Sequence, residues 1–125
     1  MSKLQVVVME ARGVPKVDVV GWSDPYVQVK VNDGKVVETK VRKNEKNPVW
    51  DKRFQFNATS KDTLHLRLMD KDAISKDDPI GEIVIPLGSF KVGEFQCAWF
   101  PVKLYPDVKP DKTPCQIRLL IELLP

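Results

Sequence analysis

Apolar and polar side chains alternate along most of this chain with a period of two residues. The alternation is clearest in six runs, which cover residues 4–8, 27–31, 54–56, 64–68, 83–85 and 117–121. A strand with this pattern turns one face toward a core and the other toward solvent. Turn residues such as Asn32-Asp33-Gly34 and Asn47-Pro48 stand between the runs. The pattern predicts about eight short strands and no long amphipathic helix, and therefore an all-β, antiparallel β-sandwich.

The composition indicates the size of this fold and its solvent. Of the 125 residues, 42% are hydrophobic and 30% are charged, which is the profile of one globular domain with one modest core. We therefore expect a single domain over residues 1–125. The apolar runs fall well short of the roughly 18 residues of a transmembrane helix, so any membrane contact is expected to be peripheral. A net charge of +3 without an arginine-rich run gives no indication of nucleic-acid binding.

The ends of the chain and its two cysteines indicate the compartment. No signal peptide or prenylation motif is recognisable, and Cys97 and Cys115 lie far apart in sequence. We expect a cytoplasmic protein with two reduced thiols, with a disulfide between them as the alternative.

Acidic residues gather in two segments that each lie between strands, residues 18–24 and 70–78. Carboxylates crowded in this way repel one another unless a cation is present. Calcium suits such a site because it takes six to eight oxygen ligands in irregular geometry, whereas zinc prefers histidine or thiolate, which these loops lack. One aspartate-rich loop alone is more often a solvated turn. An EF-hand is excluded because its sixth and twelfth positions, counted from Asp70, are Ser75 and Gly81 instead of glycine and glutamate.

Three motifs resemble those of the C2 domain family, and the resemblance covers nearly the whole chain. Residues 21–27 read GWSDPYV, close to the G-x-S-D-P-Y-V of the family, and residues 70–78 reproduce its D-x-D-x-x-S-x-x-D loop. Residues 47–56 match its N-P-x-W and F-x-F landmarks, although Asp51-Lys52 replace the usual Asn-Glu. The resemblance implies an eight-stranded C2 sandwich. It also implies the second, circularly permuted topology (type II), because the chain begins at the strand before the first acidic loop and ends with an extra strand.

The same resemblance implies a set of calcium ligands and an ion count. The ligands would be five carboxylates, one hydroxyl and two backbone carbonyls: Asp18, Asp24, Asp70, Asp72, Asp78, Ser75, Val17 and Lys71. They would hold two or three calcium ions. Five carboxylates carry about −5 at neutral pH and two ions add about +4, so a loaded site would tolerate an anionic phospholipid.

Two further surfaces are candidates for membrane contact. The tips of the acidic loops carry apolar residues that could enter the headgroup region: Val19, Val20, Trp22 and Ile74. In related C2 domains a lysine-rich sheet face binds phosphoinositides. Here Lys30, Lys40 and Arg42 would form a partial version, with Gln28 and Glu38 in places where lysine is expected. A solvated sheet face is an equal alternative for this patch.

Together these features predict a calcium-dependent peripheral module that docks on anionic, phosphatidylserine-type membranes. We expect a monomer that is recruited from the cytoplasm to the inner face of the plasma membrane or to other membranes when calcium rises. We expect no enzymatic activity, because the single histidine, His65, lies mid-strand and no catalytic motif accompanies it. The alternative is a protein-interaction module that uses the C2 sheet face, with calcium in a minor role or none.

Overall fold

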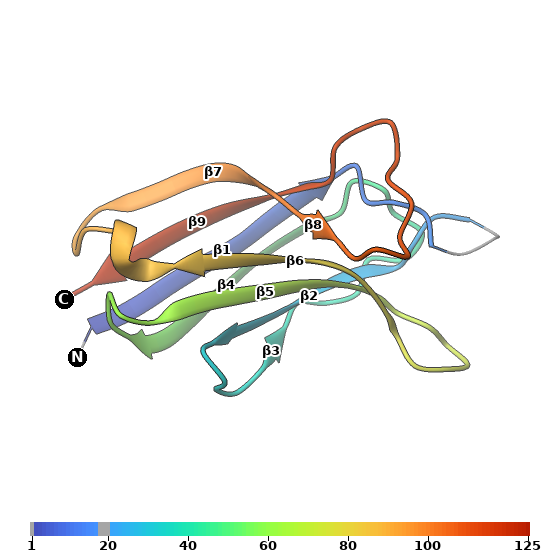
Figure 1. Ribbon diagram of the computed structural model, residues 1–125. Helices are drawn as coiled ribbons and strands as arrows, with labels where there is room; N and C mark the ends of the chain where they lie inside the picture. The colour runs from blue at the N-terminus through green and yellow to red at the C-terminus, as the bar shows by residue number, and fades with distance from the viewer. Residues whose placement is uncertain (1, 18–20) are drawn as a thin grey trace.

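Two antiparallel β-sheets pack face to face in the computed structural model, which describes residues 2–17 and 21–125 (Figure 1). Three residues of the predicted site, Asp18, Val19 and Val20, lie outside the described residues. In chain order the elements are β1 (Ser2–Arg12), β2 (Pro25–Val31), β3 (Val37–Glu38), β4 (Val49–Ala58), β5 (Thr63–Asp70), β6 (Asp78–Pro86), the 3-10 turn η1 (Leu87–Ser89), β7 (Phe95–Pro101), β8 (Lys103–Leu104) and β9 (Gln116–Leu124). The predicted all-β sandwich is confirmed. Among the described residues, no helix has the length and apolar character needed to cross a membrane.

The strand order matches the permuted topology. One sheet has the order β4-β1-β9-β7 and the other has the order β3-β2-β5-β6-β8. The last strand therefore lies beside the first, with Lys3 opposite Leu124 and Arg12 opposite Gln116. Within the described ranges the strands exceed the predicted eight by one, because the two-residue β8 adds a short edge to β6.

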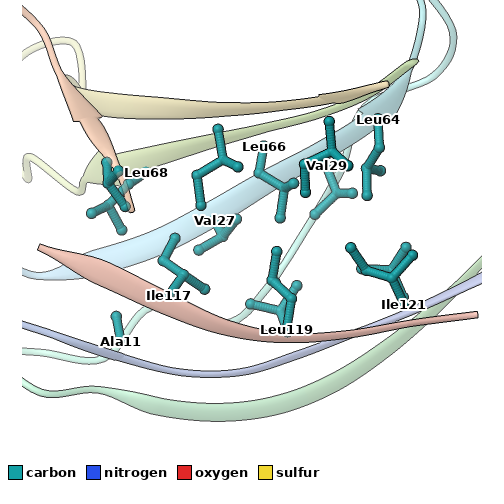
Figure 2. Close-up of a cluster of buried hydrophobic side chains, with 14 of the residues drawn as sticks. Ala11, Val27, Val29, Leu64, Leu66, Leu68, Ile117, Leu119 and Ile121 are labelled. Atoms are coloured by element: carbon teal, nitrogen blue, oxygen red, sulfur yellow. The ribbon is translucent and has the colours of Figure 1, made fainter. Parts of the chain in front are cut away.

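The core lies between the two sheets and is built from their inward-facing positions. In β9 the alternation is complete, with Ile117, Leu119, Ile121 and Leu123 each at most 1% exposed. Figure 2 shows Ile117, Leu119 and Ile121 facing the side chains of β2 and β5 across the sandwich. Removal of this apolar area from water is the main favourable term that holds the two sheets together.

Four connections emerge at one end of the sandwich, on the right of Figure 1. We call them the first loop (residues 13–24), the second loop (39–48), the third loop (71–77) and the fourth loop (105–115). The register of the five-stranded sheet sets their relative positions: Pro25 lies opposite Asp70, which lies opposite Asp78. The sheet therefore brings the ends of the first and third loops side by side.

Candidate metal centre

Three of the predicted ligands, Asp24, Asp70 and Asp78, lie at the edge of the five-stranded sheet where β5 ends and where β2 and β6 begin. The Asp70 carboxyl is buried at 1% exposure, Asp24 is half-buried and Asp78 is exposed. The backbone N–H of Asp24 donates to Asp70 Oδ1 at 2.7 Å, and the N–H of Lys71 donates to the Asp24 carbonyl at 3.0 Å. Buried carboxylates in proteins are hydrogen-bonded, paired or bound to metals. Asp70 is thus fixed in place, with the more exposed Asp24 and Asp78 beside it.

Asp72, another predicted ligand, organises the tip of the third loop. Its carboxylate accepts hydrogen bonds from Ile74 N at 2.9 Å, from Ser75 N at 3.2 Å and from Ser75 Oγ at 3.0 Å. These bonds, the one from Ile74 N first, lower the pKa of Asp72 below its ordinary value. Ser75 was predicted to assist an ion, and here its hydroxyl holds Asp72. A carboxylate has about four lone-pair positions, so these bonds leave room for a further partner.

Asp77 holds the third loop against β2, and sequence reasoning missed it. Its carboxylate accepts from Asp72 N at 3.0 Å and from the Tyr26 hydroxyl, and it pairs with Lys71 Nζ at 3.6 Å. The bond from Asp72 N, followed by that from Tyr26, lowers the pKa of Asp77. Burial and the Asp77 carboxylate raise the pKa of Tyr26. The signal was the tyrosine of the GWSDPYV motif, but the sequence does not show which residue it meets.

Asn44 of the second loop is another residue that the sequence did not single out. Its backbone N–H donates to Asp24 Oδ1 at 2.6 Å, and its side-chain oxygen accepts from Trp22 N at 2.6 Å. Asn44 has a φ of 51°, a left-handed conformation that asparagine tolerates better than most residues. Ser23 is buried, its hydroxyl donates to the Pro15 carbonyl at 2.8 Å, and its own carbonyl accepts from Glu45 N of the second loop at 3.0 Å. The second loop therefore fixes the residues that flank Asp24.

The apolar tips differ in their exposure. Ile74 is 97% exposed at the tip of the third loop, whereas Trp22 is 41% exposed. The Lys46 ammonium lies 5.1 Å from the centroid of the Trp22 ring and pairs with Asp111 of the fourth loop. Ile74 stands clear of the fold, as its prediction as a membrane tip requires, while Trp22 is held by Asn44 and Lys46 of the second loop.

The donor chemistry fits a hard cation. The predicted side-chain ligands supply only carboxylate and hydroxyl oxygens, which calcium prefers and which zinc does not. Within residues 2–17 and 21–125, no three histidine, cysteine, aspartate or glutamate side chains form a group that could hold a metal. Asp18, the carboxylate expected to complete the centre, lies outside these residues. The complete ligand set, including the carbonyls of Val17 and Lys71, stays a prediction.

The residues of the predicted basic patch line two different hollows. Lys30 lines a hollow of about 130 Å³ together with His65 and Arg67. Its Nζ also lies 3.8 Å from Asp33 Oδ1. Lys40 and Arg42 line another, of about 360 Å³. The Arg42 guanidinium there donates to the Val49 carbonyl at 2.8 Å. The structure thus divides the three cations instead of gathering them in one hollow.

Comparison with known proteins identifies the class. The C2 domain family model matches residues 2–102, and the chain belongs to the C2 domain family. Mouse Synaptotagmin-7 is 36% identical over 109 residues, which is 82% of this chain and 27% of that protein. The "Calcium-dependent lipid-binding protein" of Arabidopsis thaliana is 34% identical over 94 residues, or 74% of this chain and 18% of that protein. The chain spans about a quarter of the length of the synaptotagmins that it matches.

Solved structures show the same fold. A single C2 domain of plant Extended Synaptotagmin 1 superposes with a TM-score of 0.86 at 22% identity, covering 99% of this chain and 95% of that one. Human GIVD cytosolic phospholipase A2 gives a TM-score of 0.84 at 24% identity, over 98% of this chain and 16% of that enzyme. The second match concerns one domain of a larger enzyme. The family match ends at residue 102, so it does not include the fourth loop or β9, and a single domain over 1–125 stays a prediction.

Proposed function

We propose that this chain is a calcium-dependent module that docks peripherally on anionic phospholipid membranes, without enzymatic activity. The observation that carries the proposal is the register of the five-stranded sheet, which sets Asp70 beside Asp78 and beside Pro25, the residue after Asp24. The likeness to synaptotagmins supports the coarser part, a lipid- and membrane-binding module. The dependence on calcium and the preference for phosphatidylserine are the finer parts that experiments must test.

Hydrogen bonds already hold two of the proposed ligands in the described part of the loops, and this supports the proposal. Asp70 is fixed by the N–H of Asp24, and Asp72 by the amides of its own loop. A site held in this way loses little conformational entropy on binding. Bound calcium would supply positive charge and open coordination positions for lipid phosphate oxygens. Linkage then requires that the membrane raise the affinity for calcium by the same factor by which calcium raises that for the membrane.

Ile74 adds an apolar contact to this electrostatic one. Its side chain is 97% exposed and projects from the same loop as Asp72. Transfer of an exposed aliphatic side chain of this size out of water is worth about 1.5–3 kcal/mol. Electrostatic attraction through calcium would start membrane docking, and the apolar contact of Ile74 would slow dissociation from the membrane.

Vesicle sedimentation tests the proposal. The protein is mixed with vesicles that contain phosphatidylserine, in calcium or in EGTA. We expect pelleting in calcium only, and loss of pelleting in Asp78→Asn and in the double variant Asp70→Asn/Asp72→Asn. The matched control is Asp33→Asn, which removes a carboxylate from the turn at the opposite end of β2.

Each variant is first compared with the parent by thermal unfolding in EGTA. Asp78 is exposed, so Asp78→Asn should fold normally even if the buried Asp70 proves necessary for the fold. Pelleting that persists in EGTA, or that survives the loss of Asp70 and Asp72, would refute calcium-dependent docking. It would favour a protein- or lipid-binding surface elsewhere on the sheets.

A further inference from the structure

Three of the four sheet edges carry features that keep an edge strand from pairing with another chain. An edge strand leaves a row of backbone N–H and C=O groups open, and folds protect it by short length, charged side chains or a bulge. The edge strands β3 and β8 are each only two residues long. The edge strand β4 carries Asp51, Lys52 and Arg53, and Asp51 has a φ of 48° beside a register shift in the pairing of β1 with β4. The remaining edge is β7.

β7 has none of these protections. Its sequence up to the final proline, FQCAWF, contains no charged residue and no glycine. Among the described residues β7 pairs with β9 alone, and Figure 1 shows it on the outer side of that strand. Just beyond β7, Val102 N donates to the Cys115 carbonyl at 3.0 Å in the same register. Backbone groups of successive residues point to opposite sides of a strand, so those of Phe95, Cys97 and Trp99 point away from β9.

The side chains of the same three residues form an apolar stripe on the outer face of the sheet. Phe95 is 64% exposed and Cys97 is also exposed. Trp99 is half-buried, with the Arg12 guanidinium 4.1 Å from its ring centroid. Cys97 lies opposite Leu120, which alternates with the core residues of β9, and alternate residues of a strand share one face. The stripe therefore runs along the open edge.

The two ends of this stripe differ in charge. At the start of β7, Glu122 lies opposite on β9, and the turn before β7 carries one charge of each sign. At the far end, the Arg12 guanidinium donates to the neutral Gln116 side chain at 2.6 Å. The neighbouring Arg118 is paired with Glu10 at 3.4 Å and adds no net charge. An antiparallel copy of β7 would bring the acidic end of one chain against the basic end of the other.

We propose that β7 pairs with β7 of a second copy of this chain, antiparallel and about a two-fold axis at Cys97. In this register Cys97 faces its counterpart, and Phe95 faces Trp99 of the second copy. Each of these three residues donates and accepts one backbone hydrogen bond across the interface. A two-fold interface must be self-complementary, and this register makes it so in hydrogen bonds, aromatic contacts and charge. The pairing lies outside the proposed docking function and replaces the expectation of a monomer.

The pairing leaves the candidate metal centre uncovered. The four loops lie at one end of the sandwich, and β7 runs along its side (Figure 1). Because the two β7 strands are antiparallel, the loop ends of the two copies point in opposite directions. Self-association and calcium-dependent docking can therefore be measured separately, and failure of one leaves the other standing.

Sedimentation velocity of the full chain, in EGTA and a reducing agent, tests the pairing. An interface of one strand is small and binds weakly, so the concentration series extends to about 1 mM. The parent should shift from monomer to dimer along the series. Phe95→Lys removes both aromatic contacts, and Cys97→Lys sets two ammonium groups opposite each other, so each should raise the Kd about tenfold or more.

The matched control is Val84→Lys, which places the same charge on an apolar side chain that is 50% exposed on the other sheet. It should change the Kd by less than about twofold. Phe95 and Cys97 are exposed, so both test variants should fold as the parent does, which thermal unfolding checks.

Cross-linking with diamide tests the register, because this reagent takes two electrons and two protons from a pair of thiols and leaves a disulfide. Residues opposite each other in a hydrogen-bonded pair have Cα atoms about 5.5 Å apart, within the disulfide range of about 4.4–6.8 Å. The parent should form a disulfide dimer through Cys97, since Cys115 is buried. The double variant Cys97→Ser/Ala98→Cys moves the thiol to a residue that does not face its own counterpart, and it should cross-link much more slowly.

The outcomes separate the possible occupants of the edge. Dimers that the two β7 variants weaken and the β6 variant leaves intact support the pairing. A monomer at every concentration overturns it and leaves β7 to an extended segment of a different protein. Dimers that all three variants affect equally place the interface elsewhere and overturn it too. Equal cross-linking of the two thiol positions overturns the two-fold axis at Cys97.

Discussion

Replacement of Tyr26 by phenylalanine removes one hydroxyl group from the junction between β2 and the third loop. That hydroxyl donates to Asp77, whose carboxylate also accepts from the backbone of Asp72. Tyr26 is 5% exposed, so the phenylalanine ring can keep the same packing. The variant therefore tests the hydrogen bond alone and asks whether Asp77 holds the loop that carries Asp72.

The expected loss of stability in Tyr26→Phe follows from the two groups that form the hydrogen bond, a hydroxyl and a carboxylate. A hydrogen bond to a charged group contributes about 1.5–3 kcal/mol to stability. The Asp77 side chain is 18% exposed and keeps Lys71 as an ion-pair partner at 3.6 Å. Water and Lys71 can therefore compensate in part, and we expect a loss of about 1–2 kcal/mol. At about 2.1 cal/mol/K per residue of unfolding entropy, this corresponds to a fall in Tm of about 4–8 °C.

Urea unfolding in EGTA measures this loss without an ion. The matched control is Tyr105→Phe, whose hydroxyl lies 3.4 Å from Glu82 in a weaker bond and which should change stability by less than about 0.5 kcal/mol. The m-value should be the same in all three proteins. Equal stability of Tyr26→Phe and Tyr105→Phe at neutral pH would refute the role given to Asp77.

The pH dependence of stability gives a second test of the hydrogen bond between Tyr26 and Asp77. Hydrogen bonds hold the pKa of Asp77 below its ordinary value in the folded protein. Its stabilising contribution is therefore complete above the unfolded pKa of about 3.9, and it is lost as pH falls through the lower folded value. The difference in stability between the parent and Tyr26→Phe should be full at neutral pH and should shrink in acid. A difference that grows in acid would contradict this assignment.

Three further outcomes concern the scaffold. Gly81→Ala should destabilise the domain and loosen β8, because an added Cβ would lie 2.6 Å from the Lys103 carbonyl oxygen. Thermal unfolding followed by circular dichroism should show a lower Tm than that of the parent. Leu119→Ala should cost about 2–5 kcal/mol in urea unfolding, because this side chain is fully buried between the sheets. In the folded protein one thiol should react with a thiol reagent: Cys97 is exposed, whereas burial raises the pKa of Cys115 to about 12. Two thiols titrated at once in the native protein would contradict the last expectation.

The alternation of apolar and polar residues was sufficient to predict most of the strands of the fold. The alternation in residues 117–121 places every second side chain in the core, and the structure buries Ile117, Leu119 and Ile121. The C2 resemblance implied the permuted topology, and the structure pairs the last strand with the first. The extra β8 was not predictable, because a two-residue strand has no periodicity and depends on the close approach that Gly81 permits.

The candidate site was predictable in its residue types and less so in its contacts. The spacing of Asp70, Asp72 and Asp78 is visible in the sequence, and the register of the sheet then sets Asp70 against Asp78. Tyr26 and Asp77 are 51 residues apart, and Asn44 reaches Asp24 from another loop. Hydrogen bonds of this kind depend on how loops cross one another, and no pattern along the chain encodes them.

The sequence by itself determined an all-β sandwich with aspartates concentrated in two segments, because period-two alternation and short-range spacing are local properties of a chain. Only the tertiary structure decided that Asp77 braces the third loop, that Lys46 links Trp22 to Asp111, and that the fourth loop walls a hollow beside Asp78. The physical reason is that these contacts join segments distant in sequence, and their geometry follows from the packing of the two sheets.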